Sequence, residues 1–125
     1  MNATALAAVF VGGGFGSVLR YVIGQGIGKL SATLPWGTFA ANVLATLILA
    51  LLFRAIPAAD DASQSMTKLL WMTGFCGGFS TFSTFSLDTV VLYEQWGWPA
   101  AAGNVALNVI CCVALAAWFV LQRTV

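Results

Sequence analysis

The fold is decided by the stretch Thr73-Gly-Phe-Cys-Gly-Gly-Phe-Ser-Thr-Phe-Ser-Thr-Phe-Ser86, which lies within an apolar segment. Two adjacent glycines, Gly77 and Gly78, precede a Phe-Ser-Thr triplet that occurs twice. Each glycine lowers helix propensity by about 1 kcal/mol relative to alanine. The pair therefore predicts a helix that is broken near Gly77-Gly78 and leaves carbonyl groups without helical partners. In hydrocarbon, such a break is tolerated only where it is buried or hydrated.

The repeated triplet predicts an aromatic stripe bordered by hydroxyl groups. On a helix that turns about 100° per residue, Phe79, Phe82 and Phe85 span an arc of about 120°. In one interpretation the rings only pack, and the neighbouring hydroxyls bond to carbonyls one turn earlier. We favour the other, a functional site inside a membrane span, because rings and hydroxyls are so dense here. The hydroxyls belong to Ser80, Thr81, Ser83 and Thr84.

Composition places the whole chain in a membrane. Of its 125 residues, 60% are hydrophobic and 7% are charged, which is far from the composition of soluble domains. A spanning helix needs about 20 mainly apolar residues. We therefore expect an all-α membrane protein in which residues 1–125 form one domain of four transmembrane helices. The predicted spans are Ala3–Ile27, Thr38–Ile56, Lys68–Leu92 and Ala100–Leu121.

The reactive side chains argue against an enzyme. The chain has no histidine, and only two acidic residues lie within or beside the spans, which leaves little for hydrolytic chemistry. The three cysteines fall inside predicted spans, without the spacing of a zinc site or a disulfide framework. A net charge of +1 indicates no acidic partner such as a nucleic acid. The cysteines are Cys76, Cys111 and Cys112.

Arg20 is the one cation placed deep in a predicted span. It lies about 12 Å of helix rise before Lys29. A guanidinium at such depth costs at least about 2.5 kcal/mol unless it meets water, carbonyls or an anion. Either Arg20 faces a protein-lined vestibule or it reaches the headgroups by snorkelling. The same span has glycines four residues apart, which predict close helix contacts at Gly12-Gly16 and Gly24-Gly28.

Asn42 and Asp88 are the polar side chains of interest in the second and third spans. Asn42 follows Thr38 by one turn and shares its face, so its amide serves either as glue between helices or as part of an aqueous path. Asp88 follows Thr84 by one turn. It is either a helix-end carboxylate in water or a member of a polar path.

The fourth span carries two amides on one face. Asn104 and Asn108 are spaced at i and i+4, and Cys112 continues the same stripe. This spacing predicts either a polar lane or a seam of interhelical hydrogen bonds, and the sequence does not separate the two.

The basic residues give almost no bias in orientation. Arg54, Lys68 and Arg123 lie on the side of the N-terminus, whereas Lys29, with Arg20 nearby, lies on the other. Such a chain can insert in both orientations, and two opposed copies would be related by a two-fold axis in the membrane plane. Four short helices also have too little girth to enclose an aqueous path alone. We therefore expect an antiparallel, dual-topology homodimer.

Over its whole length the chain closely resembles the Fluc/CrcB family of bacterial fluoride channels. The residues that carry the likeness are Gly13, Arg20-Tyr21, Trp36-Gly-Thr38, Asn42, Thr73-Gly-Phe-Cys-Gly-Gly and Thr81-Phe-Ser-Thr-Phe85. The resemblance implies a dual-topology homodimer in the inner membrane, with two pores through which fluoride leaves the cytoplasm passively. It also implies a structural Na⁺ ion at the dimer centre, held by main-chain carbonyls that by position belong to Gly77 and Ser80.

The resemblance further implies roles for individual residues. Phe82 and Phe85 are similar to the paired rings whose edges face the fluoride path, and the positive edge of an aromatic ring suits a small anion. Asn42 is similar to the pore asparagine and Arg20 to the vestibule arginine. Hydroxyl and amide donors can replace lost hydration without trapping the ion. The other residues assigned to this path are Ser83, Thr84, Thr38, Thr81, Asn108 and Asp88.

The sequence departs from the family pattern in two places. Family members commonly carry Glu where Asp88 stands, and Tyr, Ser or His in place of the fourth-span residues Asn104, Asn108 and Cys112. Two other functions are alternatives to a fluoride channel. A small dual-topology multidrug exporter needs a carboxylate in its first helix, and the first span has none. A non-conducting assembly subunit would use the glycines and amides only for packing.

Overall fold

Three of the apolar stretches form continuous helices in the computed structural model, which describes residues 2–29, 33–56 and 66–122. They are α1 (Ala3–Gly28), α2 (Trp36–Ala55) and α5 (Trp98–Leu121). Each begins and ends within two residues of a predicted span, and each is long and apolar enough to cross a membrane. No strand occurs in the described ranges, so the all-helical prediction is confirmed there.

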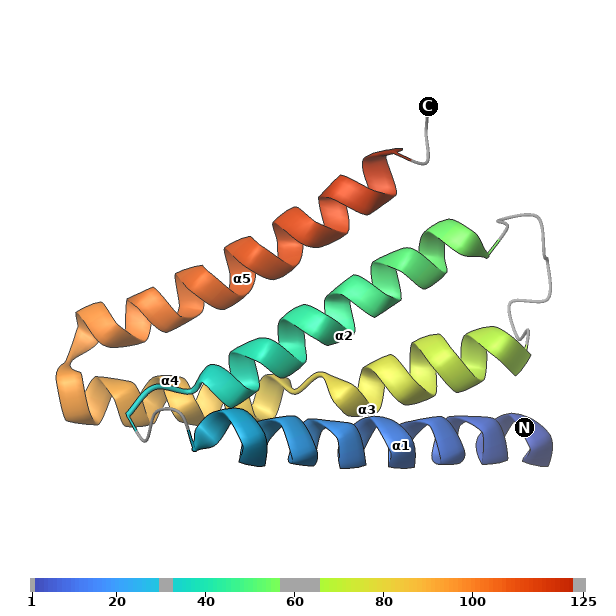
Figure 1. Ribbon diagram of the computed structural model, residues 1–125, viewed down its shortest axis with the longest axis horizontal. Coiled ribbons are helices and arrows are strands. Elements are labelled where there is room, and N and C mark those ends of the chain that lie inside the picture. Colours follow the sequence, from blue (N-terminus) through green and yellow to red (C-terminus); the bar gives the residue numbers. More distant parts are fainter. Residues whose placement is uncertain (1, 30–32, 57–65, 123–125) are drawn as a thin grey trace.

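The third apolar stretch is interrupted. It begins as the π-helix η1 (Lys68–Cys76), continues in the single turn α3 (Gly77–Phe79) and resumes as α4 (Phe82–Trp96). Figure 1 shows η1 and α3 running beside α1, followed by a non-helical link to α4, which packs against α5 instead. The break falls at Ser80 and Thr81, where the backbone is extended, with ψ angles of 158° and 111°.

The prediction that the chain opens at the two glycines is therefore wrong by three residues. Gly77 is helical and Gly78 lies inside α3. The role of Gly78 is to allow close packing between helices, and it does not open the backbone. A Cβ atom at Gly78 would collide with the backbone of Gly13 on α1. Gly12 and Gly16 similarly bring α1 against the backbone of the broken helix. The first predicted glycine pair is thus a helix contact. In the second, Gly24 meets Gly37 on α2, whereas Gly28 has no such neighbour.

The predicted single stripe of three rings is also wrong, because the break lies between Phe79 and Phe82. Phe79 is buried in the core with Ala41 and Ala45 of α2, and its ring lies 5.8 Å from that of Phe75. Phe82 and Phe85 instead form a separate pair on α4, with ring centroids 5.6 Å apart. The core therefore holds α1, α2 and α3 together. The rings of Phe82 and Phe85 lie on α4, outside this core.

The remaining helices pack as two antiparallel neighbours of the broken one. α2 lies between α1 and α5, and α5 follows α2 to its end, where Arg54 donates to the side chain of Gln122 at 2.9 Å (Figure 1). α4 turns directly into α5 at Gly97, whose φ of 78° is open to glycine but strained for other residues. The start of α1 and the end of α5 lie at the same end of the molecule.

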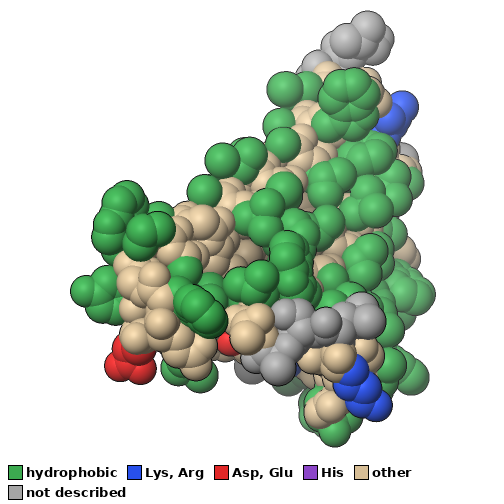
Figure 2. All heavy atoms as spheres, turned by 60° about the vertical axis from the view of Figure 1, so that its left-hand side comes forward, with side chains coloured by type: hydrophobic (Ala, Val, Ile, Leu, Met, Phe, Trp, Pro, Cys, Tyr) green, Lys and Arg blue, Asp and Glu red, His purple; other side chains and the backbone are tan. Residues whose placement is uncertain are grey.

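The outer surface is apolar. Figure 2 shows a face made almost entirely of hydrophobic side chains, with few charged groups in view. Large side chains such as Phe10, Phe15 and Trp118 are between 65% and 82% exposed, which excludes water as their medium. Residues 57–65, which include Pro57, Asp60 and Asp61, lie outside the described residues, as does Arg123.

Candidate functional site

The helix break is held open by one side chain from α2. Asn42 accepts a hydrogen bond from the main-chain N–H of Thr81 at 2.7 Å, and its amide nitrogen lies 3.4 Å from the Thr81 carbonyl oxygen. The main-chain N–H and the carbonyl of Thr81 thus both meet a single primary amide. The hydroxyl of Thr81 also caps α4 by accepting from the N–H of Thr84 at 3.2 Å.

A series of amides extends from Asn42 toward α5. The second hydrogen of the Asn42 amide points to Oδ1 of Asn108 at 3.3 Å, and Asn108 is buried. Asn108 donates to the side-chain oxygen of Asn104 at 3.1 Å, and Asn104 donates to the hydroxyl of Thr89 at 2.9 Å. The α5 amides Asn104 and Asn108 therefore form a hydrogen-bonded seam. Asn42 both joins α2 to the helix break and lines a cavity described below.

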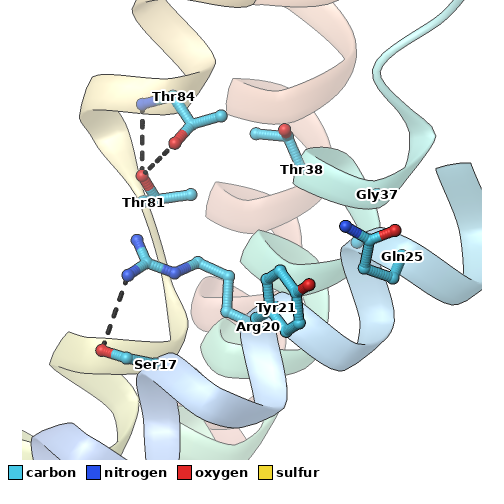
Figure 3. Close-up of a pocket in the computed structure, with 9 residues that line it drawn as sticks. Ser17, Arg20, Tyr21, Gln25, Gly37, Thr38, Thr81 and Thr84 are labelled. Carbon is cyan, nitrogen blue, oxygen red and sulfur yellow. Dashed lines mark hydrogen bonds between the residues drawn. The ribbon is translucent and has the colours of Figure 1, made fainter.

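Arg20 faces a polar cavity of about 340 Å³ between α1, α2 and α4 (Figure 3). Its guanidinium donates to Ser17 over 3.5 Å and points toward Thr81 rather than toward the end of the span. The geometry supports the vestibule interpretation over snorkelling. The other residues lining this cavity are Tyr21, Gly24, Gln25, Gly37, Thr38 and Thr84.

A second cavity, of about 310 Å³, lies on the other side of the break. Thr81 lines both cavities, so it separates them. Phe85 is buried, whereas Phe82 is 80% exposed on the surface of the single chain. Phe82 and Phe85 both line this second cavity, which we call the ring cavity. The other residues that line the ring cavity are Asn42, Thr46, Ser80, Asn108, Val109, Cys112 and Val113.

Asp88 is tied to α2 at the edge of the vestibule. Its carboxylate accepts from the Thr38 hydroxyl at 2.6 Å, and Asp88 also lines a smaller cavity of about 170 Å³ with Thr33 and Gln95. Thr38 therefore lies between the vestibule and this smaller cavity. Thr38 and Asn42 were predicted to share one helix face, but Thr38 lines the vestibule whereas Asn42 lines the ring cavity.

Two predicted residues lie apart from these cavities. Ser83 is exposed, and its hydroxyl lies 3.4 Å from that of Thr81. Gly77 is exposed on the outer face, whereas Ser80 lines the ring cavity. The hydroxyls that bond back to a carbonyl one turn earlier are those of Thr46, Ser86 and Thr89, rather than those of the repeated triplets.

Sequence reasoning missed several polar residues that the fold brings to the site. Ser17 lies one turn before Arg20, and this helical spacing could have indicated it. Thr89 is one turn after Phe85, but only its contact with Asn104 reveals its part in the seam. Gln25 and Thr46 carry no distinguishing pattern.

The fold and the site define a small membrane protein, all-helical in its described ranges, with a broken helix between two cavities. A family model described as "CrcB-like protein, Camphor Resistance (CrcB)" matches residues 7–120, and the chain belongs to this family.

Curated relatives match over most of their length. A protein of Serratia proteamaculans named fluoride-specific ion channel FluC is 43% identical over 105 residues, covering 84% of this chain and 82% of the relative. Its namesake in Nitrobacter winogradskyi is 40% identical over 119 residues, covering 91% and 94%. That of Escherichia fergusonii is 40% identical over 116 residues, covering 90% and 91%.

Proposed function

We propose that the protein is a fluoride-selective channel of the bacterial inner membrane that lets fluoride leave the cytoplasm passively and so protects against its toxicity. One observation carries the proposal. In a chain whose relatives are named fluoride-specific channels, a helix break brings hydroxyls, an amide and two aromatic rings to the walls of two adjoining cavities. The function is conduction rather than catalysis.

The proposed path begins at Arg20, whose charge attracts anions into the vestibule. It continues past Thr84 and Thr81 to the cavity of Phe82 and Phe85, which is also lined by Asn42 and Asn108. Hydroxyl donors and positive ring edges replace hydration piecemeal, so that the ion is admitted without being trapped. Ser83, Thr38 and Asp88 are proposed to border the same path.

The working unit is proposed to be a homodimer of two opposed copies, each with four transmembrane helices. In this proposal η1, α3 and α4 together make the fourth crossing, which is supported by their succession along one interrupted helical segment whose first part packs on α1. The exposure of Phe82 supports a dimer, because a second copy would complete the wall that a single chain leaves open. The apolar outer face suits both lipid and a partner of the same kind.

A structural sodium ion between the copies is proposed to be held by the carbonyls of Gly77 and Ser80. In an uninterrupted α-helix these oxygens would accept from the N–H groups of Thr81 and Thr84. Those groups donate instead to Asn42 and to the Thr81 hydroxyl, so the two carbonyls are deprived of their helical donors. Oxygen ligands of this kind suit a hard cation. Anomalous scattering should place an ion on the two-fold axis, and an empty axis at high resolution would count against it.

Fluoride efflux from liposomes tests the function against its rivals. A passive channel carries fluoride down its gradient when a protonophore holds the proton gradient at zero. A drug exporter coupled to protons would stop under the same condition, and an assembly subunit would carry no flux at all. The rivals are not favoured, because α1 supplies no carboxylate and the relatives are named as channels.

A further inference from the structure

One continuous series of side-chain hydrogen bonds leaves α4 at the helix break and returns to α4 one turn later. It starts at the N–H of Thr81 and ends at the carbonyl oxygen of Phe85, which accepts from the Thr89 hydroxyl at 2.7 Å. Between these ends the series crosses to α2, then to α5, and back. Its intermediate members are Asn42, Asn108, Asn104 and Thr89.

The two ends determine the orientation of every amide between them. A main-chain N–H can only donate and a carbonyl can only accept. Because Thr81 donates to Asn42, the amide nitrogen of Asn42 faces α5, and Asn108 must present its oxygen. Asn108 then presents its nitrogen to Asn104, which presents its own nitrogen to Thr89. The hydroxyl of Thr89 must accept there, because its proton is given to Phe85.

We propose that Asn104 and Thr89 are positioning residues for the helix break. Together with the main-chain carbonyl of Asn104, which also accepts from the Asn108 amide at 3.1 Å, they fix Asn108, and through it Asn42, in the one orientation that pairs with the main chain of Thr81. Asn104 does this from outside the ring cavity. It borders a separate apolar cavity of about 200 Å³ that also contains Phe39, Leu92 and Leu107.

Loss of this orientation has a definite structural consequence. If Asn108 turns its amide around, it offers a nitrogen to the nitrogen of Asn42, and Asn42 must turn in response. The N–H of Thr81 then faces another donor and loses its partner at the break. The hydroxyl of Thr81 separates the two cavities, so its main chain is where a change in Asn104 reaches the proposed ion path.

Exchange of the Thr81 amide hydrogen measures the positioning without recourse to ion flux. In ¹⁵N-labelled protein in nanodiscs, Asn104→Leu should speed this exchange about tenfold. This factor corresponds to the free energy of one lost hydrogen bond. Thr89→Val keeps the shape of the side chain while removing the acceptor for Asn104, and it should act in the same direction. Asn104→Asp retains an acceptor for Asn108 and should restore slow exchange.

Thr46→Val is the matched control for this measurement. The Thr46 hydroxyl donates to the main-chain carbonyl of Asn42 at 2.8 Å but takes no part in the amide series. The control should therefore leave Thr81 exchange unchanged. If Thr46→Val speeds exchange as much as Asn104→Leu does, general loosening explains the effect and the positioning role is overturned.

The effect on ion flux rests on the proposed function and is measured separately. Fluoride efflux should fall about tenfold in Asn104→Leu and recover in Asn104→Asp. Normal Thr81 exchange in both Asn104→Leu and Thr89→Val would overturn the positioning role, and altered exchange with normal efflux would overturn its link to the proposed ion path. If the unaltered protein carries no fluoride while Asn104→Leu still speeds exchange, the amide series is supported and only the function fails.

Discussion

Phe82 and Phe85 are neighbours on one helix turn but lie in different surroundings. Phe85 is buried and Phe82 is open, although their rings touch. We expect Phe82→Ile or Phe85→Ile to abolish or strongly reduce fluoride efflux from liposomes. Isoleucine keeps most of the apolar volume, so packing should change by less than about 1.5 kcal/mol, but the positive ring edge is lost. Each 1.4 kcal/mol added to the barrier costs a tenfold loss of rate.

Size-exclusion chromatography at matched protein density separates loss of conduction from loss of fold in these variants. A dimer peak like that of the unaltered protein, together with slow efflux, supports the role of the ring edges. Nearly normal efflux from both variants would assign the rings to packing alone.

Arg20 should act at a distance, by concentrating anions in the vestibule. We expect Arg20→Gln to lower fluoride efflux, and to lower it more at about 0.01 M salt than at about 0.15 M, because the Debye length shrinks from about 30 Å to about 8 Å. Lys29→Gln is the control, since Lys29 is an exposed cation at the end of α1. A deficit that does not depend on salt would show that Arg20 acts only through its local contacts.

At the scale of elements, the glycines of α1 should matter by position rather than by number. A Cβ at Gly16 would strike the backbone of Phe75, whereas Gly14 has nothing within 4 Å. Gly16→Ala should therefore destabilise the protein by about 1–3 kcal/mol, the usual cost of overpacking. Gly14→Ala should be neutral or slightly stabilising, because alanine favours helix. Thermal unfolding in detergent compares them, and equal melting temperatures would contradict the close contact.

The location of the break shows where sequence reasoning ends. Composition predicted the helices, and the hydroxyl-rich stretch identified the interrupted one. The position of the interruption depends on a partner 39 residues away, because Asn42 supplies the acceptor for the Thr81 amide. Glycine propensity alone favours Gly77 and Gly78, but packing against α1 keeps Gly78 helical.

The α5 amides show the same limit. Their i, i+4 spacing predicted a shared face, and α5 does bring Asn108 and Cys112 to the cavity of the two rings. The choice between an open lane and a bonded seam depended on whether Asn42 and Thr89 approach that face, which requires the tertiary structure. Neither partner can be read from periodicity within α5.

At the scale of the whole molecule, the weak charge bias predicts that both orientations are present in one membrane. Single cysteines placed at Lys29 and at Asp60, in a background without the native cysteines, can be labelled from outside intact cells with an impermeant reagent. We expect both sites to react, because opposed copies present each of them outward in half of the chains. Labelling at one site alone would contradict dual topology.

The central claim is selective, passive conduction of fluoride, and one measurement tests it most directly. Purified protein is reconstituted in liposomes loaded with equal concentrations of fluoride and chloride, and the initial efflux of each ion is recorded with ion-selective electrodes. We predict rapid fluoride efflux with chloride efflux no faster than from protein-free liposomes. Equal efflux of both ions would contradict selectivity, and fluoride efflux at the protein-free rate would contradict conduction altogether.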